Sequence, residues 1–223
     1  MVGVHGQIRS GLRITKVKIP TLQQAKIMLE ESEKLNPGPW VDHSINVARA
    51  AKAIASLHPE LDADNAYIVG YLHDIGRRVG TTDMRQDMRH ILDGYTYLND
   101  LGFEDAARIC LTHSFPIQNI NMIAGVWDCT QEEKQFVATY LEQIEYTVYD
   151  RLIQLCDALA LASGFCLIDK RLIDVSLRRG VDEFTVPRWK GYFALQAEFD
   201  EAIGQSIYSV LDGVVENTFG FKV

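Results

Sequence analysis

The chain has 223 residues, of which 47% are hydrophobic and 23% are charged. It is therefore long enough to bury one well-filled core, and its composition is not that of a disordered protein. The formal net charge is −8. Proteins that hold long nucleic acids by neutralising phosphates usually have a basic surface, so this charge excludes that class and leaves small phosphorylated ligands open.

No stretch of the sequence is apolar over the roughly 18 residues that a membrane-spanning helix needs. The segment 1–20 also lacks the apolar run of a signal peptide. The four cysteines, Cys110, Cys129, Cys156 and Cys166, include no CxxC pair, and we interpret them as small side chains in a reducing compartment. We expect a cytoplasmic protein with no membrane partner.

Apolar residues at helical spacing dominate the chain, and no convincing run of strands is found, so the predicted fold class is all-α. After a weakly patterned N-terminal segment, 1–20, helices are expected over residues 21–35, 39–57, 62–76, 88–101, 104–112, 131–141, 147–163 and 191–216. Thr21 is the expected N-cap of the first helix, and Gly76 is the expected C-cap glycine of the third.

The expected helices are predicted to form a helical bundle over residues 21–170 and a C-terminal helical extension over 171–223 packed on the same domain. An Arg-rich turn is expected at 178–180. The last helix has an apolar side that includes Phe193 and Phe199, which favours packing on the core. Alternatively, this apolar side covers a homodimer interface or the rim of the active site, and residues 188–190 would then lie near the entrance of that site.

Two acidic and two imidazole side chains interrupt the apolar pattern of helices that must pack together. His73 and Asp74 end the most hydrophobic predicted helix, where a buried carboxylate is costly unless it meets a cation or several hydrogen bonds. His43 shares a helix face with apolar residues, and Asp157 lies in the apolar segment 152–160. Each has an ordinary structural interpretation alone, but one shared cation explains all four.

The order of these residues resembles the HD superfamily of metal-dependent phosphohydrolases. The stretch 73–76, His-Asp-Ile-Gly, is identical to the HDIG variant of the superfamily's signature, and the similarity covers roughly residues 38–165. The resemblance implies that the helical bundle over residues 21–170 is an HD domain and that His43, His73, Asp74 and Asp157 hold a metal ion. Mixed His and Asp ligation suits Fe, Mn, Zn, Co or Ni, so a divalent transition metal is the expected cofactor, as one or two ions.

His90 and His113 resemble the two further histidines of HD proteins that bind a second metal, with Asp74 as the bridge. An antiparallel pair of helices over 88–101 and 104–112 would bring both beside Asp74. The spacing is most similar to small bacterial HDIG hydrolases that cleave diadenosine tetraphosphate symmetrically. Cyclic-di-GMP phosphodiesterases fit less well, because their Gly-Tyr-Pro signature is absent and Ser114 replaces a second histidine. Alternatively, His90 and His113 are surface or substrate-contacting residues.

The resemblance implies a phosphohydrolase for a small phosphorylated metabolite, such as a nucleotide, with Asp74 and Arg77 as catalytic residues. Divalent metals lower the pKa of water and neutralise phosphate oxygens, and Arg77 is the candidate to bind phosphate beside them. For Arg78, Arg85 and Arg89 a solvated surface role is favoured. The alternatives are a nucleotide-binding signalling protein without hydrolysis and a di-iron oxygenase of the same fold.

Overall fold

The computed structural model describes residues 17–80 and 88–221. These residues form ten α-helices, which are α1 (Leu22–Leu35), α2 (Trp40–Ala55), α3 (Ala63–Leu72), α4 (Arg89–Asp100), α5 (Glu104–Thr112), α6 (Gln131–Gln143), α7 (Val148–Asp157), α8 (Ile168–Arg179), α9 (Thr185–Ile203) and α10 (Val214–Phe219). Three short 3-10 helices join them, η1 (Ile75–Val79), η2 (Ile120–Met122) and η3 (Ile207–Val210). The only strands in this part of the chain, β1 (Ala160–Leu161) and β2 (Gly164–Phe165), pair as a small antiparallel hairpin. The all-α prediction is confirmed.

Local capping explains several helix starts. The Thr21 side chain accepts a hydrogen bond from the backbone N–H of Gln24, whose own side chain accepts from the backbone of Thr21. The same reciprocal capping box begins α6 at Thr130 and α7 at Thr147. Such caps satisfy backbone donors that a helix start leaves unpaired, so these starts are encoded within a few residues of sequence.

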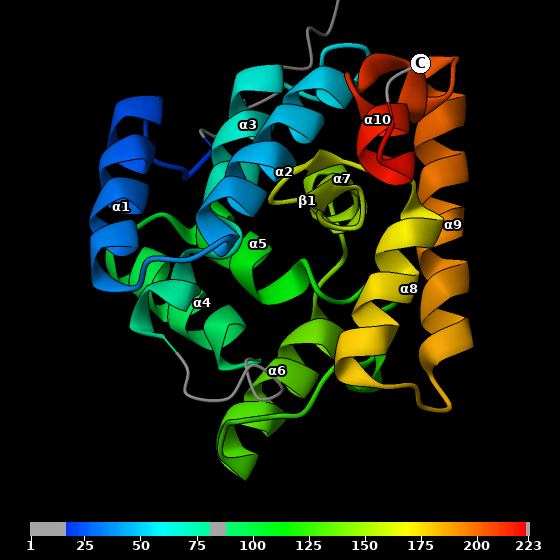
Figure 1. Cartoon of the computed structure of the whole chain (residues 1–223). Coiled ribbons are helices and arrows are strands. Elements are labelled where there is room, and N and C mark those ends of the chain that lie inside the picture. The colour runs from blue at the N-terminus through cyan, green and yellow to red at the C-terminus, as the bar shows by residue number, and fades with distance from the viewer. Residues whose placement is uncertain (1–16, 81–87, 222–223) are drawn as a thin grey trace, which may run out of the picture.

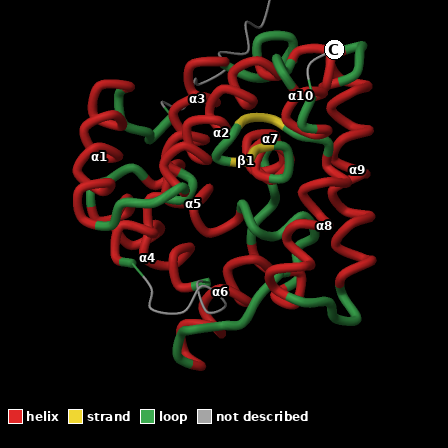
Figure 2. The backbone as a smooth tube through the Cα atoms, in the orientation of Figure 1, coloured by secondary structure: helices red, strands yellow, loops and turns green. Residues whose placement is uncertain are grey.

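Helix α7 lies in the middle of the bundle and contacts helices on both sides, as Figures 1 and 2 show. On one side, α2 and α3 pack on each other and on α7, and α5 also packs on α7, with α1 and α4 farther out. On the other side, α9 packs on α7 and α8 packs on α9. The side chains of Val47, Leu72 and Ile153 are fully buried where α2, α3 and α7 meet. Burial of this apolar surface is the main stabilising contribution.

The third helix ends earlier than predicted. Helix α3 stops at Leu72, and the chain continues through His73 and Asp74 into η1, so Gly76 is not its C-cap. A Cβ atom on Gly76 would lie 1.9 Å from the carbonyl oxygen of His90 and 2.4 Å from the backbone nitrogen of Gly94. Gly76 is thus needed for the close approach of η1 to α4 rather than for a helix end.

The last third of the chain also differs from prediction. Helix α7 ends at Asp157 rather than near residue 163, because the chain turns into the β1–β2 hairpin. Helix α8 was not predicted, and Arg178 and Arg179 form its last turn. The expected helix 191–216 is divided into α9, η3 and α10, and α9 ends at Ile203, followed by Gly204 with a left-handed φ of 71°.

The apolar residues predicted on that last helix pack mainly within the chain. The side chains of Phe199, Ile207 and Val214 are buried, whereas Phe193 is exposed. The boundaries 21–170 and 171–223 remain predictions, as does a homodimer. No helix in the described ranges is long and apolar enough to cross a membrane. Most of the N-terminal segment 1–20 lies outside the described residues.

Candidate metal centre

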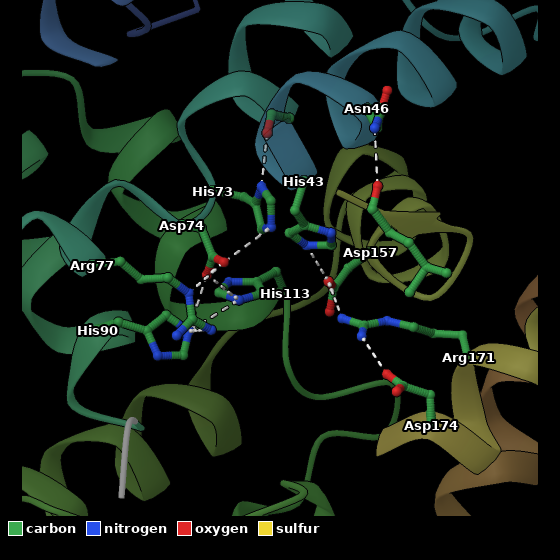
Figure 3. A network of polar contacts seen from close by, with 12 residues as sticks. His43, Asn46, His73, Asp74, Arg77, His90, His113, Asp157, Arg171 and Asp174 are labelled. Carbon is green, nitrogen blue, oxygen red and sulfur yellow. Dashed lines mark hydrogen bonds and ion pairs between the residues drawn. The ribbon is translucent and has the colours of Figure 1, made fainter. Parts of the chain in front are cut away.

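Five helices bring the six predicted metal ligands together (Figure 3). The ligands come from the first turn of α2, from the connection between α3 and η1, from the start of α4, from the C-cap of α5 and from the last residue of α7. They are His43, His73, Asp74, His90, His113 and Asp157. All except the half-buried Asp157 are buried.

The first cluster contains His43, His73 and Asp157. Each of these side chains offers one ligand atom, and the three atoms lie within 4.8 Å of one another. His43 Nε2 is 2.9 Å from Asp157 Oδ1, and the His43 and His73 rings meet edge to face with centroids 5.3 Å apart. Three such ligands around one point can hold a single ion.

The second cluster shares His73 with the first and adds Asp74 and His113. His113 Nε2 lies 3.5 Å from Asp74 Oδ1, and His90 Nε2 lies 3.1 Å from the same oxygen. The two Nε2 atoms of His90 and His113 are 3.4 Å apart. Helices α4 and α5 therefore bring the start of one helix beside the end of the other, as the predicted antiparallel pair requires.

Backbone carbonyl groups orient two of the imidazole rings. Nδ1 of His73 donates to the carbonyl oxygen of Gly70 at 2.7 Å, and Nδ1 of His113 donates to that of Cys110 at 2.9 Å. Each ring then directs the lone pair of Nε2 into the centre, which is the tautomer needed for metal binding.

Two buried atoms at the centre have no hydrogen-bond partner among the described residues: His73 Nε2 and Asp74 Oδ1. Leaving a buried polar atom unpaired costs about 1–3 kcal/mol, and more for a charged group. Both atoms can donate an electron pair, and His73 and Asp74 belong to the same cluster of ligand atoms. The residues therefore fit a divalent cation, which would satisfy both atoms.

The pKa shifts also favour the protonation states that bind metals. Burial, opposed only in part by Asp74, lowers the pKa of His73, and burial lowers that of His113 to about 3. Burial alone would raise the pKa of Asp74, but Arg77 and the nearby histidines outweigh it and hold this pKa well below its usual value. Burial alone would also raise the pKa of Asp157, but the hydrogen bond and charge of His43 outweigh it and lower this pKa. Neutral imidazoles and ionised carboxylates are the ligand forms.

The arginines near the centre have different partners. Arg77 Nε donates to Asp74 Oδ2 at 2.5 Å, so the guanidinium lies beside the cluster as predicted but pairs with a ligand carboxylate. Arg78 stacks on the ring of Tyr97 at 4.0 Å, and Arg89 pairs with Asp93. The predicted surface role of Arg85 concerns a position outside the described residues.

A cavity of about 1080 Å³ opens from the centre to the surface. His43, Asp74, His90, His113 and Asp157 line its inner end. The arginines along its walls are Arg77, Arg89, Arg171, Arg178, Arg179 and Arg188. Of the segment 188–190 predicted near the entrance, the first two residues line the cavity. The chain as a whole is acidic, yet six arginine side chains line this one cavity.

Helix α8 supplies side chains that the sequence analysis missed. Arg171 Nη2 lies 3.7 Å from Asp157 Oδ1, and Arg171 Nη1 lies 3.3 Å from Asp174 Oδ2. The missed signal was the spacing of Ile168 and Leu172, whose side chains are buried one turn apart on the inner face of α8.

Comparison with known proteins gives one match. The model of a family described as the HD domain matches residues 40–162, which is more than half of the chain and includes all six clustered His and Asp residues. No curated protein and no solved structure matches the chain.

Proposed function

The chain belongs to the HD domain family of metal-dependent phosphohydrolases, and from this membership we propose that it cleaves a phosphate ester or anhydride bond of a small phosphorylated metabolite, specifically a nucleotide. The finer assignment to the HDIG subgroup, similar to the symmetrical diadenosine-tetraphosphate hydrolases, belongs to the same proposal. The alternatives are nucleotide binding without hydrolysis and di-iron oxygenase chemistry.

One observation carries the proposal: six candidate metal-ligating side chains lie together, two of them have unpartnered buried ligand atoms, and five of the six line an arginine-lined cavity. His43, His73 and Asp157 would hold one cation. Asp74, His90 and His113 would hold a second, with His73 within reach of both clusters. Divalent cations there would lower the pKa of water and neutralise phosphoryl oxygens as negative charge develops.

The protein's own residues have two further tasks. Arg77, which lines the cavity beside Asp74, would bind a phosphoryl oxygen next to the ligands and hold it there. The rings of His73 and His113 are fixed by backbone carbonyls, so they would hold their positions when the substrate enters. Such pre-organisation means that little reorganisation is needed during the reaction.

The cavity supports a nucleotide rather than a smaller phosphate ester. Its volume of about 1080 Å³ slightly exceeds the roughly 300–1,000 Å³ common for small-molecule sites. Trp40 and Trp189 line it, so aromatic surface is present as well as charge. All six ligand positions are filled, which favours hydrolysis over binding alone.

A panel of phosphate esters and nucleotides, assayed for phosphate release with added Mn, Co or Ni, tests the proposal. We expect hydrolysis of at least one nucleotide by the native chain and none by Asp74→Asn, which keeps the side-chain shape but removes the charge. Lys26→Gln, on the exposed surface of α1, is the control. Oxygen uptake without phosphate release would instead support the oxygenase.

A further inference from the structure

A second pocket, of about 350 Å³, lies where η2, α6 and the connection from α8 to α9 meet. Its volume is within the roughly 300–1,000 Å³ common for small-molecule sites. Four of its lining side chains are apolar or aromatic, namely Ile120, Ile123, Trp127 and Phe184. None of its lining residues also lines the metal-centre cavity. The pocket is therefore separate from the proposed phosphohydrolase site, and we refer to it as the α6 pocket.

Two side chains of opposite charge, Lys134 and Glu183, line the α6 pocket. Among the described residues, neither side chain forms a hydrogen bond or an ion pair within 4 Å, with the other or with any further group. The third charged residue of the lining, Asp182, differs, because its Oδ1 already accepts from Arg188 Nη2 at 3.0 Å. The pocket therefore presents one ammonium group and one carboxylate group that a ligand can pair.

Aromatic surface accompanies these two charges. The Trp127 ring stacks on the ring of Phe115, with centroids 6.4 Å apart, and the Lys134 ammonium lies 5.8 Å from the Trp127 centroid. These contacts hold the Trp127 ring in place, yet the side chain is only half-buried, as is that of Phe184. An apolar group of a ligand that covered both rings would remove further apolar surface from water.

Arg188 fixes two walls of the α6 pocket to each other. Its side chain is buried, and its guanidinium donates to the carbonyl oxygen of Ile123 on one wall and to Asp182 Oδ1 on the other. The carboxylate of Asp182 also accepts from the backbone N–H of Phe184 at 3.0 Å, which holds that residue beside it. The pocket is thus formed before any ligand enters, so binding requires little ordering of the protein.

We propose that the α6 pocket binds a free α-amino acid with an aromatic or large apolar side chain. The α-carboxylate of the ligand would pair with Lys134, its α-ammonium with Glu183, and its side chain would cover Trp127 and Phe184. A ligand with only an anionic group would leave Glu183 unpaired, and one with only a cationic group would leave Lys134 unpaired. A zwitterion therefore matches the pocket better than either, because it forms two charge-assisted hydrogen bonds. The site does not depend on the proposed phosphohydrolase function.

Isothermal titration calorimetry of the full-length protein with L-phenylalanine tests the site. Two analogues, 3-phenylpropanoate and phenethylamine, keep the aromatic ring but each lack one of the two charges. We expect L-phenylalanine to bind at least ten times more tightly than either analogue, because each analogue loses one charge-assisted hydrogen bond. No detectable binding of L-phenylalanine, or equal binding of all three compounds, would overturn the proposal.

Variants of the two charged residues assign the contacts. Lys134→Gln and Glu183→Gln should each weaken binding of L-phenylalanine about tenfold. Lys134→Gln should not weaken binding of phenethylamine, which has no carboxylate, and Glu183→Gln should not weaken binding of 3-phenylpropanoate, which has no ammonium group.

Matched controls come from α1, where Lys26 and Glu31 are exposed and lie outside the pocket lining. Lys26→Gln and Glu31→Gln make the same changes of charge and should alter L-phenylalanine binding less than twofold. Losses in these controls equal to those in Lys134→Gln and Glu183→Gln would show that only the net charge matters, and the α6 pocket would not be the site.

Discussion

Replacing Gly76 by alanine should damage both the packing of η1 on α4 and the metal centre. The added Cβ atom would lie 1.9 Å from the carbonyl oxygen of His90 and 2.4 Å from the backbone nitrogen of Gly94. Both neighbours are backbone atoms, so no side chain can move aside. Restoring an ordinary contact requires α4 to move by about 1.5 Å.

Overpacking of this kind usually costs about 1–3 kcal/mol. Because the obstacle here is backbone, we expect Gly76→Ala to lower the free energy of unfolding of the metal-free protein by about 3 kcal/mol. The shift should also carry His90, at the start of α4, out of reach of Asp74. Metal sites tolerate misplacement of roughly 0.5 Å, so the second cluster should lose its ion.

Urea denaturation and elemental analysis measure the two effects. Gly102→Ala is the control, because Gly102 follows the far end of α4 with a left-handed φ of 80° and has no atom within 4 Å of an added Cβ. It should cost about 1 kcal/mol through backbone strain and leave the metal content unchanged. If Gly76→Ala matched the native protein in stability and metal content, the close approach of η1 to α4 would not be needed for the centre.

Three further predictions concern the centre. Asp74→Ala should abolish metal binding and hydrolysis while the helical circular dichroism persists; full activity at unchanged metal content would contradict this. Arg77→Ala should raise KM or slow turnover without removing metal, and native kinetics would assign Arg77 to a role outside substrate binding. The pKa of His113 is lowered by burial to about 3, so between pH 6.5 and 3 the unfolded chain binds a proton that the folded chain does not. Stability of the metal-free protein should therefore fall as pH drops, by about 2 kcal/mol from pH 7 to pH 5, and a flat profile by urea denaturation would refute it.

Helices with local signals were predicted closely. Helix α5 has the predicted bounds, Glu104–Thr112, and α1 begins directly after its predicted N-cap, Thr21. Both signals lie within a few residues of the helix ends. The end of α7 has no such signal. There the Asn46 side chain donates to the carbonyl oxygens of Leu161 and Ala162, a contact more than 100 residues apart in sequence that supports the hairpin instead of a longer helix.

The part of the site that depends on residue spacing and on the pairing of neighbouring helices was predictable from the sequence. His90 and His113 meet because one short turn joins α4 to α5, and that geometry follows from helix lengths. Arg171 and Asp174 were missed because α8 itself was not predicted. Their proximity to Asp157 depends on how α8 and α9 fold back onto α7, which is a tertiary effect that local patterns do not encode.

We propose that one centre holds two ions, with Asp74 between His73, His90 and His113. Elemental analysis of protein purified with metal present tests it most directly. We predict close to two ions per chain, falling toward one in His90→Ala and in His113→Ala. A stoichiometry of one ion that neither substitution changes would contradict the claim.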